Sequence, residues 1–115
     1  MVSYKFVVFT NAKPGRDEDY NQWYEGQHFP DVLKVPGFVS AQRFGLADEQ
    51  RSEDARAWKY LALYDIETDD IGGVLAELSR RLGTAQMPAT DAMHEQRMPF
   101  IFVPLTPLVL SSTES

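Results

Sequence analysis

The chain has 115 residues and a formal net charge of -6 at pH 7, with 43% hydrophobic and 24% charged residues. This length and composition fit one folded domain and exclude a disordered chain. The negative charge and the scattered Lys and Arg residues argue against a nucleic-acid partner. We predict a single domain over residues 1–110 and a polar tail over residues 111–115.

The chain has no cysteine, which limits its chemistry and permits a reducing compartment. Disulfides, thiolate nucleophiles and cysteine-bound metals are therefore excluded. The apolar run over residues 6–9 is too short for a signal sequence or a membrane span. We expect a cytoplasmic protein with no membrane partner.

The first third of the chain predicts a strand and then an interrupted helix. Residues 3–10 are mostly aromatic or β-branched and apolar on both alternating sets, which indicates a strand buried on two faces. Residues 17–28 indicate a helix, with Asp17 as its N-cap. Pro30 should end or kink that helix, with room for one further turn over residues 31–35.

The middle of the chain predicts two strands and a second helix. Residues 38–46 alternate as a strand, and the charged residues 47–56 form a solvated hairpin loop. Residues 58–66 indicate a third strand. Apolar residues at helical spacing over residues 69–82 indicate an amphipathic helix that begins with two aspartates and ends before a glycine.

The last part of the chain has weaker patterns. We expect residues 84–97 to be mostly loop, with a short helical turn over residues 91–94, and this loop could form a lid. Residues 98–105 form a final strand, which Pro99 and Pro104 restrict to an edge or an irregular pairing. The order β-α-β-β-α-β predicts an α+β, ferredoxin-like fold with both helices on one face of an antiparallel sheet.

The strand composition also predicts the assembly. If the helices cover one face of the sheet, the other face is more apolar than a monomer usually exposes. The residues expected there are Val7, Phe9, Leu61, Leu63 and Phe100 or Ile101. We therefore predict a homodimer with sheet packed on sheet.

The first helix carries most of the groups capable of chemistry. Tyr20, Tyr24 and His28 recur every four residues, so on a helix the two phenols and the imidazole lie along one face. That face is either a packed surface or the wall of a pocket.

The segment WYEGQHFPDVLKVPGFVSAQRF resembles EthD-like proteins of the dimeric α+β barrel superfamily. The pattern is an aromatic pair, a histidine followed by a proline, a hydrophobic turn, Pro-Gly-Phe and an arginine-containing strand. It covers about a quarter of the chain and comprises Trp23, Tyr24, His28, Pro30, Leu33, Pro36, Gly37, Phe38 and Arg43.

This resemblance implies a dimer of ferredoxin-like units, each with a pocket between helices and sheet. Proteins of this superfamily include cofactor-independent oxygenases, isomerases, polyketide cyclases and decarboxylases, so the fold does not fix a reaction. Some EthD-like sequences carry a second histidine beside the first, whereas Gln27 precedes His28 here.

His28 and Tyr24 are the predicted catalytic residues. A neutral imidazole can accept a proton near pH 7, and a tyrosine can polarise or position a substrate oxygen. The alternative for His28 is a cap at the helix end, where a cation suits the helix dipole. Tyr24 is alternatively a core residue.

Four further residues are predicted to bind the substrate, namely Tyr20, Arg43, Tyr60 and Tyr64. Tyr20 shares the helix face, and Tyr60 and Tyr64 share a strand face that can line the same cavity. Arg43 lies mid-strand, where a charge needs an anionic ligand or a salt bridge, by default to Asp31 or Glu25.

These residues favour a small protein that binds an aromatic or polyketide-like molecule and transfers protons without a cofactor. Isomerisation, cyclisation and decarboxylation suit this chemistry equally, and the resemblance adds oxygenation. The alternative is a non-catalytic ligand-binding or scaffold protein in which His28 caps the helix. We predict no metal site, because the only two histidines, His28 and His94, are far apart and lack metal-ligand spacing.

Overall fold

The computed structural model describes residues 1–112. Residues 113–115 of the predicted polar tail lie outside the described residues. The elements, in chain order, are β1 (Val2–Ala12), α1 (Asp17–Trp23), η1 (Tyr24–His28), α2 (Phe29–Leu33), β2 (Phe38–Gly45), η2 (Glu53–Arg56), β3 (Tyr60–Thr68), α3 (Ile71–Arg81) and β4 (Met93–Phe102).

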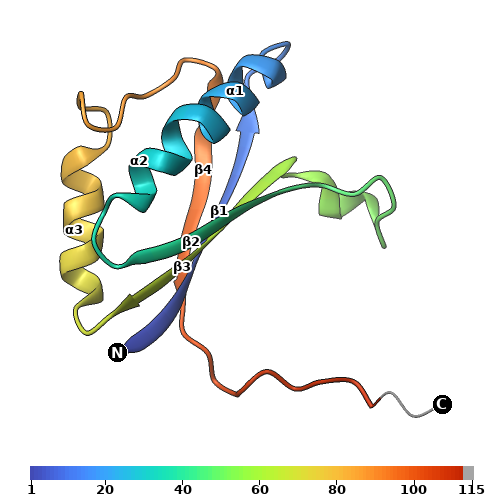
Figure 1. Cartoon of the computed structure of the whole chain (residues 1–115). Helices are drawn as coiled ribbons and strands as arrows, with labels where there is room; N and C mark the ends of the chain where they lie inside the picture. The colour runs from blue at the N-terminus through green and yellow to red at the C-terminus, as the bar shows by residue number, and fades with distance from the viewer. Residues whose placement is uncertain (113–115) are drawn as a thin grey trace.

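The four strands form one antiparallel sheet in the order β2-β3-β1-β4. The helical stretch from α1 to α2 and helix α3 both cover one face of this sheet, as Figure 1 shows. The alternating apolar residues of the central strands explain this arrangement, because Val8, Ala62 and Tyr64 are buried beneath the helices. The predicted α+β, ferredoxin-like fold is therefore confirmed.

The first helix does not end at Pro30, where the sequence predicts an end or a kink. It widens into the π-helical turn η1 and then continues as α2, with Pro30 in the first turn of α2. Within this turn the Phe29 N–H donates to the carbonyl of Tyr24, five residues earlier. Proline has no N–H to contribute to the helix ladder, and a π-turn can shift that ladder by one residue.

Asp17 is not the N-cap, which is a correction to the sequence prediction. Arg16 occupies that position and makes no side-chain cap hydrogen bond. Asp17 is the first helical residue, and its Oδ2 accepts hydrogen bonds from the Tyr60 hydroxyl at 2.6 Å and the Lys59 ammonium at 3.0 Å. A residue expected to start the helix therefore ties it to β3.

The last strand begins earlier than predicted. Residues 93–97, expected to be loop with a helical turn, extend β4, and Arg97 pairs with Thr10 of β1. Met93 pairs with Ala12 after a register shift. Strand β4 lies at the edge of the sheet, which agrees with the presence of Pro99, because an edge strand needs no second row of N–H donors.

A close approach between β2 and α3 requires glycine at position 37. Gly37 has φ of 105°, which side-chain-bearing residues rarely adopt, and a Cβ built there would lie 2.8 Å from the Val74 Cγ2. The Pro-Gly turn predicted from the sequence therefore sets the distance between the start of β2 and helix α3.

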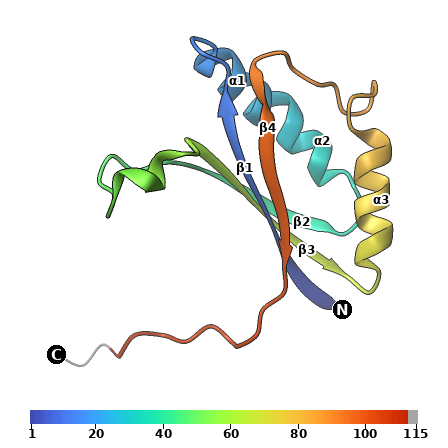
Figure 2. The same ribbon diagram turned by 180° about the vertical axis from the view of Figure 1, so that it is seen from behind.

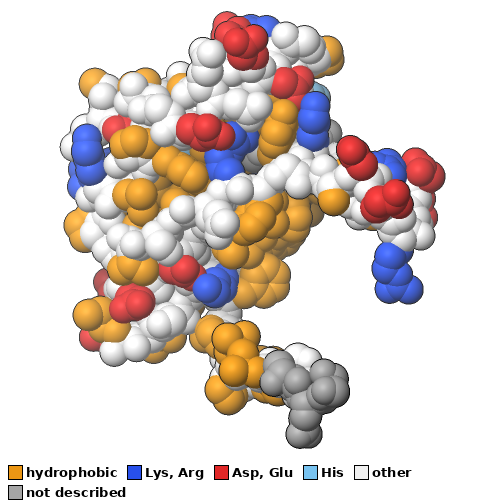
Figure 3. Space-filling model, turned by 45° about the vertical axis from the view of Figure 1, so that its right-hand side comes forward, with side chains coloured by type: hydrophobic (Ala, Val, Ile, Leu, Met, Phe, Trp, Pro, Cys, Tyr) orange, Lys and Arg blue, Asp and Glu red, His pale blue; other side chains and the backbone are white. Residues whose placement is uncertain are grey.

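The sheet face opposite the helices has an apolar centre, as predicted, and the Lys5–Asp65 ion pair lies on the same face toward one end. Val7 pairs with Leu63 and Phe100, and Phe9 pairs with Leu61, so these five side chains share one face. Of the two residues predicted as alternatives, the pairing register places Phe100, and not Ile101, on this face. Figure 2 shows the β2–β3 connection and the segment after β4 projecting away from the helices, and Figure 3 shows hydrophobic side chains gathered between them.

Candidate functional site

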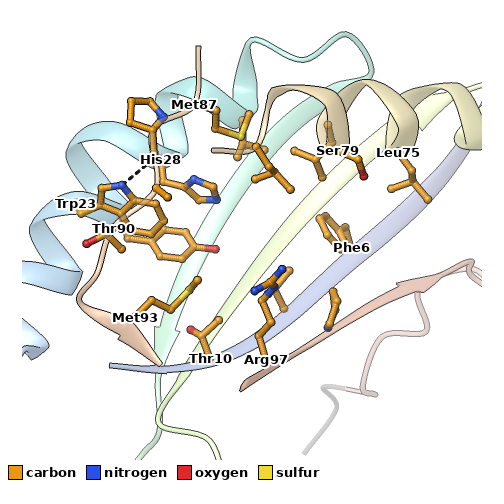
Figure 4. Close-up of a pocket in the computed structure, with 18 of the residues that line it drawn as sticks. Phe6, Thr10, Trp23, His28, Leu75, Ser79, Met87, Thr90, Met93 and Arg97 are labelled. Carbon is orange, nitrogen blue, oxygen red and sulfur yellow. Dashed lines mark hydrogen bonds between the residues drawn. The ribbon is translucent and has the colours of Figure 1, made fainter. Parts of the chain in front are cut away.

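A pocket of about 510 Å³ lies between the helices and the sheet (Figure 4). Ligand sites typically have volumes of about 300–1,000 Å³, so the space suits a small organic molecule. The segment between α3 and β4 closes one side with Met87 to Thr90. The full lining is Phe6, Val8, Thr10, Trp23, Tyr24, His28, Val32, Leu75, Leu78, Ser79, Leu82, Met87, Pro88, Ala89, Thr90, Met93, Arg97, Pro99 and Ile101.

His28 forms part of the pocket wall and is held by aromatic neighbours. Its ring stacks on Trp23 with centroids 4.5 Å apart, and meets the Tyr24 ring edge-on at 4.9 Å. The Trp23 indole N–H in turn donates to the Pro88 carbonyl at 3.1 Å, drawn as a dashed line in Figure 4. The orientation of the imidazole therefore depends on the closing segment as well as on the helix.

The contacts expected of a helix cap at His28 do not occur. The helix continues through His28, and among residues 1–112 neither ring nitrogen makes a hydrogen bond, although Nδ1 is buried. Buried polar atoms without partners are rare and call for an explanation such as a ligand or water.

Burial lowers the pKa of His28 to about 4, and the nearby carboxylate of Asp31 only partly opposes this change. The charged imidazolium is disfavoured because the surroundings are apolar. At neutral pH the ring is uncharged, so one nitrogen carries a proton and the other is a free acceptor.

Tyr24, the other predicted catalytic residue, also lines the pocket. Its hydroxyl lies 2.7 Å from the Tyr64 hydroxyl, and both side chains are buried. Burial is the main cause that raises the pKa of both phenols above the usual value. When Tyr64 donates to Tyr24, the Tyr24 proton remains available for another acceptor.

The guanidinium of Arg43 lies behind the pocket, against tyrosine rings rather than in the cavity. Its centre is 4.6 Å from the Tyr24 ring, 5.1 Å from Tyr60 and 5.3 Å from Tyr20. It forms an ion pair with Glu25 at 2.9 Å, one of the two partners predicted by default. Cation–π contacts of this kind join β2 to the first helix.

The other three predicted substrate-binding residues also lie outside the pocket lining. The Tyr20 hydroxyl contacts the Thr10 hydroxyl, Tyr60 donates to Asp17, and Tyr64 bonds Tyr24. The structure thus brings His28 and Tyr24 together at the cavity. Direct ligand contacts by Tyr20, Arg43, Tyr60 and Tyr64 stay a prediction.

Several lining residues could not be identified from the sequence. Trp23 lines the pocket, and its only signal in the sequence is the aromatic pair that it forms with Tyr24. Arg97 falls at the end of a predicted loop, and no local pattern marks it. His94 lies outside the lining, and its Nδ1 accepts the Gln96 N–H at 3.1 Å.

Neither a metal site nor a membrane-spanning helix is found within residues 1–112. These residues include no group of three or more His, Asp or Glu side chains placed to hold a metal ion. None of their helices is both long and apolar enough to cross a membrane.

Replacing Tyr64 by phenylalanine is expected to lower the free energy of unfolding by about 1–3 kcal/mol, because the buried Tyr24 hydroxyl loses its partner. The double variant Tyr24→Phe/Tyr64→Phe should lose less than the sum of the two single changes, because no hydroxyl is then left unpaired. Urea unfolding of the four proteins measures both quantities. Additive losses would show that the two hydroxyls do not interact.

Comparisons with solved structures find proteins of the same fold at low sequence identity. A protein described provisionally as an antibiotic biosynthesis monooxygenase from Nitrosomonas europaea has 20% identity and a TM-score of 0.61, covering 91% of this chain and 92% of that one. A Streptomyces coelicolor monooxygenase in complex with the ligand nanaomycin D has 16% identity and a TM-score of 0.56, covering 96% and 93%.

An EthD family protein from Bacillus halodurans has 11% identity and a TM-score of 0.50, covering 91% of this chain and all of that one, 100%. No family model and no curated protein matches the chain. At these identities the likeness establishes the fold, and the predicted resemblance to EthD-type proteins is confirmed at that level.

Proposed function

We propose that the protein binds an aromatic or polyketide-like small molecule in the pocket and transfers a proton through His28. The observation that carries this proposal is a neutral imidazole in the wall of an apolar cavity of about 510 Å³, with no hydrogen-bond partner among residues 1–112. The ligand named for the Streptomyces coelicolor structure of the same fold supports the choice of ligand class.

The proposed step is removal of a proton next to a carbonyl group. The C–H proton moves to a His28 nitrogen, and the electron pair of the broken bond enters an enolate whose charge lies on oxygen. Tyr24 can donate its hydroxyl proton to that oxygen in a hydrogen bond. Return of the proton to a different carbon gives an isomer, and attack of the enolate on a second carbonyl of the substrate gives a ring.

The low pKa of His28 also supports a second candidate, non-catalytic binding of the same class of molecule. An imidazole with a pKa of about 4 is a weak base in the empty pocket. An enolate forming beside the ring would raise this pKa, because a negative charge favours the imidazolium. The two candidate functions therefore differ in a measurable quantity, the rate at which the protein removes a proton from a bound ketone.

In this proposal the residues behind the pocket position Tyr24. Arg43 packs on its ring and Tyr64 bonds its hydroxyl, while Tyr20 meets it edge-on at 5.6 Å and Tyr60 contacts Tyr20 at 5.3 Å. Rigid support of this kind holds a catalytic group within the small tolerance that proton transfer allows.

The proposal includes a homodimer that covers the apolar sheet face. Phe44, Met98, Phe100 and Phe102 on this face are 38–55% exposed in the single chain. The segment after β4 exposes further apolar side chains, with Leu105 at 95%. A second copy is the partner whose apolar face matches, and we keep the cytoplasm as the expected compartment.

Hydrogen exchange of a simple ketone tests the catalytic part. The C1 protons of 2-tetralone, followed by NMR in D2O, should exchange faster with the protein than with buffer. His28→Gln should remove most of this acceleration, about a hundredfold, as for loss of a general base. A variant with an unchanged rate would contradict the base role and favour binding alone.

Filling the cavity tests the location of the site. Ala89 lines the pocket and Ala85, on the same segment, does not, although both residues are exposed. Ala89→Phe should weaken binding of 2-naphthamide, measured by calorimetry, by about tenfold or more, because the added ring occupies ligand space. Ala85→Phe should bind like the parent protein. Equal affinities for both variants would place the ligand elsewhere.

A further inference from the structure

Arg97 is the only charged side chain in the lining of the pocket among the described residues, since His28 is neutral. It extends from β4, on the side of the sheet that faces the helices. Figure 4 shows its guanidinium group directed into the cavity, with His28 and Trp23 on the helix side. Its neighbours along this face of β4 are Pro99 and Ile101, which are apolar and also line the pocket.

Most of the other arginines have carboxylate partners, and Arg97 has none within the described part of the chain. Within residues 1–112, five of the seven arginines form ion pairs, and the two without one are Arg51 and Arg97. Arg51 lies in the solvated β2–β3 connection. Glu95, two residues from Arg97 on the same strand, forms no ion pair with it and does not line the pocket.

A guanidinium beside an apolar cavity has a defined preference. Its planar fork of N–H donors matches the two oxygens of a carboxylate, and Arg97 is exposed in the single chain, so a carboxylate that enters the pocket can reach it. No acidic side chain lines the cavity, so an anionic ligand meets no like charge from the described residues there. The neutral state of His28 also leaves Arg97 as the one positive group of this lining.

We propose that Arg97 binds the carboxylate of an apolar acid, so that the substrate class is aromatic or polyketide-like carboxylates. This inference rests on the proposed ligand-binding function of the pocket. The carboxylate would lie at the β4 edge and the ring system against Trp23. Arg97 then acts as a specificity-determining residue that orients the ligand relative to His28.

Two matched probes test this assignment by calorimetry at low salt. The first probe, 2-naphthoate, carries the carboxylate, and 2-naphthamide is its neutral isostere. The parent protein should bind 2-naphthoate about tenfold to a hundredfold more tightly, as expected for charge-assisted hydrogen bonds. Arg97→Met should remove that preference, with a far larger loss of affinity for 2-naphthoate than for 2-naphthamide. Arg51→Met, which removes the other unpaired arginine, should behave like the parent.

The results distinguish a failure of this inference from a failure of the proposed function on which it rests. Equal binding of both probes by the parent, or a preference that survives in Arg97→Met, would overturn the role of Arg97 and leave the pocket proposal standing. Failure of the parent to bind either probe would overturn both. If Arg97→Met does not fold, Arg97→Lys should retain part of the preference, because it keeps the charge and loses the planar fork. A full preference in that variant would contradict bidentate binding.

Discussion

Phe100→Glu is expected to convert the proposed dimer into a monomer. Phe100 lies on the outer sheet face beside Val7, and its side chain is 38% exposed in the single chain. In a sheet-on-sheet dimer the substitution buries a carboxylate without a partner in each copy, which costs about 3–5 kcal/mol. The dissociation constant should therefore rise at least about a hundredfold. Light scattering over a concentration series measures the change.

Leu33→Glu is the matched control. Leu33 lies in α2, away from the outer sheet face, and is 40% exposed, so the substitution is of similar size and exposure. This variant should remain a dimer with the parent dissociation constant. A parent protein of monomer mass at micromolar concentration would contradict the dimer itself, and a dimeric Phe100→Glu would place the interface on another surface.

The second large effect is a loss of stability in acid that depends on His28. Its pKa is about 4 in the folded chain, against 6.5 for a fully solvated histidine, so between these values the unfolded chain binds more protons. Protonation therefore favours unfolding, and the stability present above the unfolded pKa is lost as pH falls. From about pH 7 to about pH 4 this loss amounts to about 2–3 kcal/mol.

The comparison is with His28→Gln, whose amide does not titrate. Urea unfolding of both proteins at several pH values isolates the contribution of His28, because the carboxylates titrate in both. The parent should lose more stability than the variant through this window, and the difference should be flat above about pH 7. If the free energy of unfolding changes with pH in the same way in both proteins, His28 is accessible to water in the folded protein.

The topology could be predicted because it rests on local patterns. Apolar runs or alternating residues identify the first three strands, in which side chains alternate between the two faces, and apolar residues at helical spacing identify α3. The same alternation places Val7, Phe9, Leu61 and Leu63 on one face, so the composition of the outer sheet surface follows from the sequence alone. Mid-strand charge likewise predicts that Arg43 needs a partner, and Glu25 is that partner.

What could not be predicted depends on pairing between distant segments. Residues 93–97 have no strand pattern of their own and become part of β4 because β1 offers them an edge. The same pairing places Arg97 opposite Thr10 and turns it toward the pocket. The helix continues through Pro30 because one widened turn accommodates the missing N–H, a choice that proline alone does not reveal.

The state of His28 in the free and ligand-bound protein tests the central claim most directly. Imidazole nitrogen–proton correlation spectra, recorded near pH 6 with increasing 2-naphthamide, report protonation and contact at once. The expected result is a neutral His28 ring in the free protein whose nitrogen signals shift on binding, while those of His94 stay unchanged. A charged His28 ring in the free protein would contradict the claim that this residue lies in the ligand pocket. His28 signals that do not change when the ligand binds would contradict it as well.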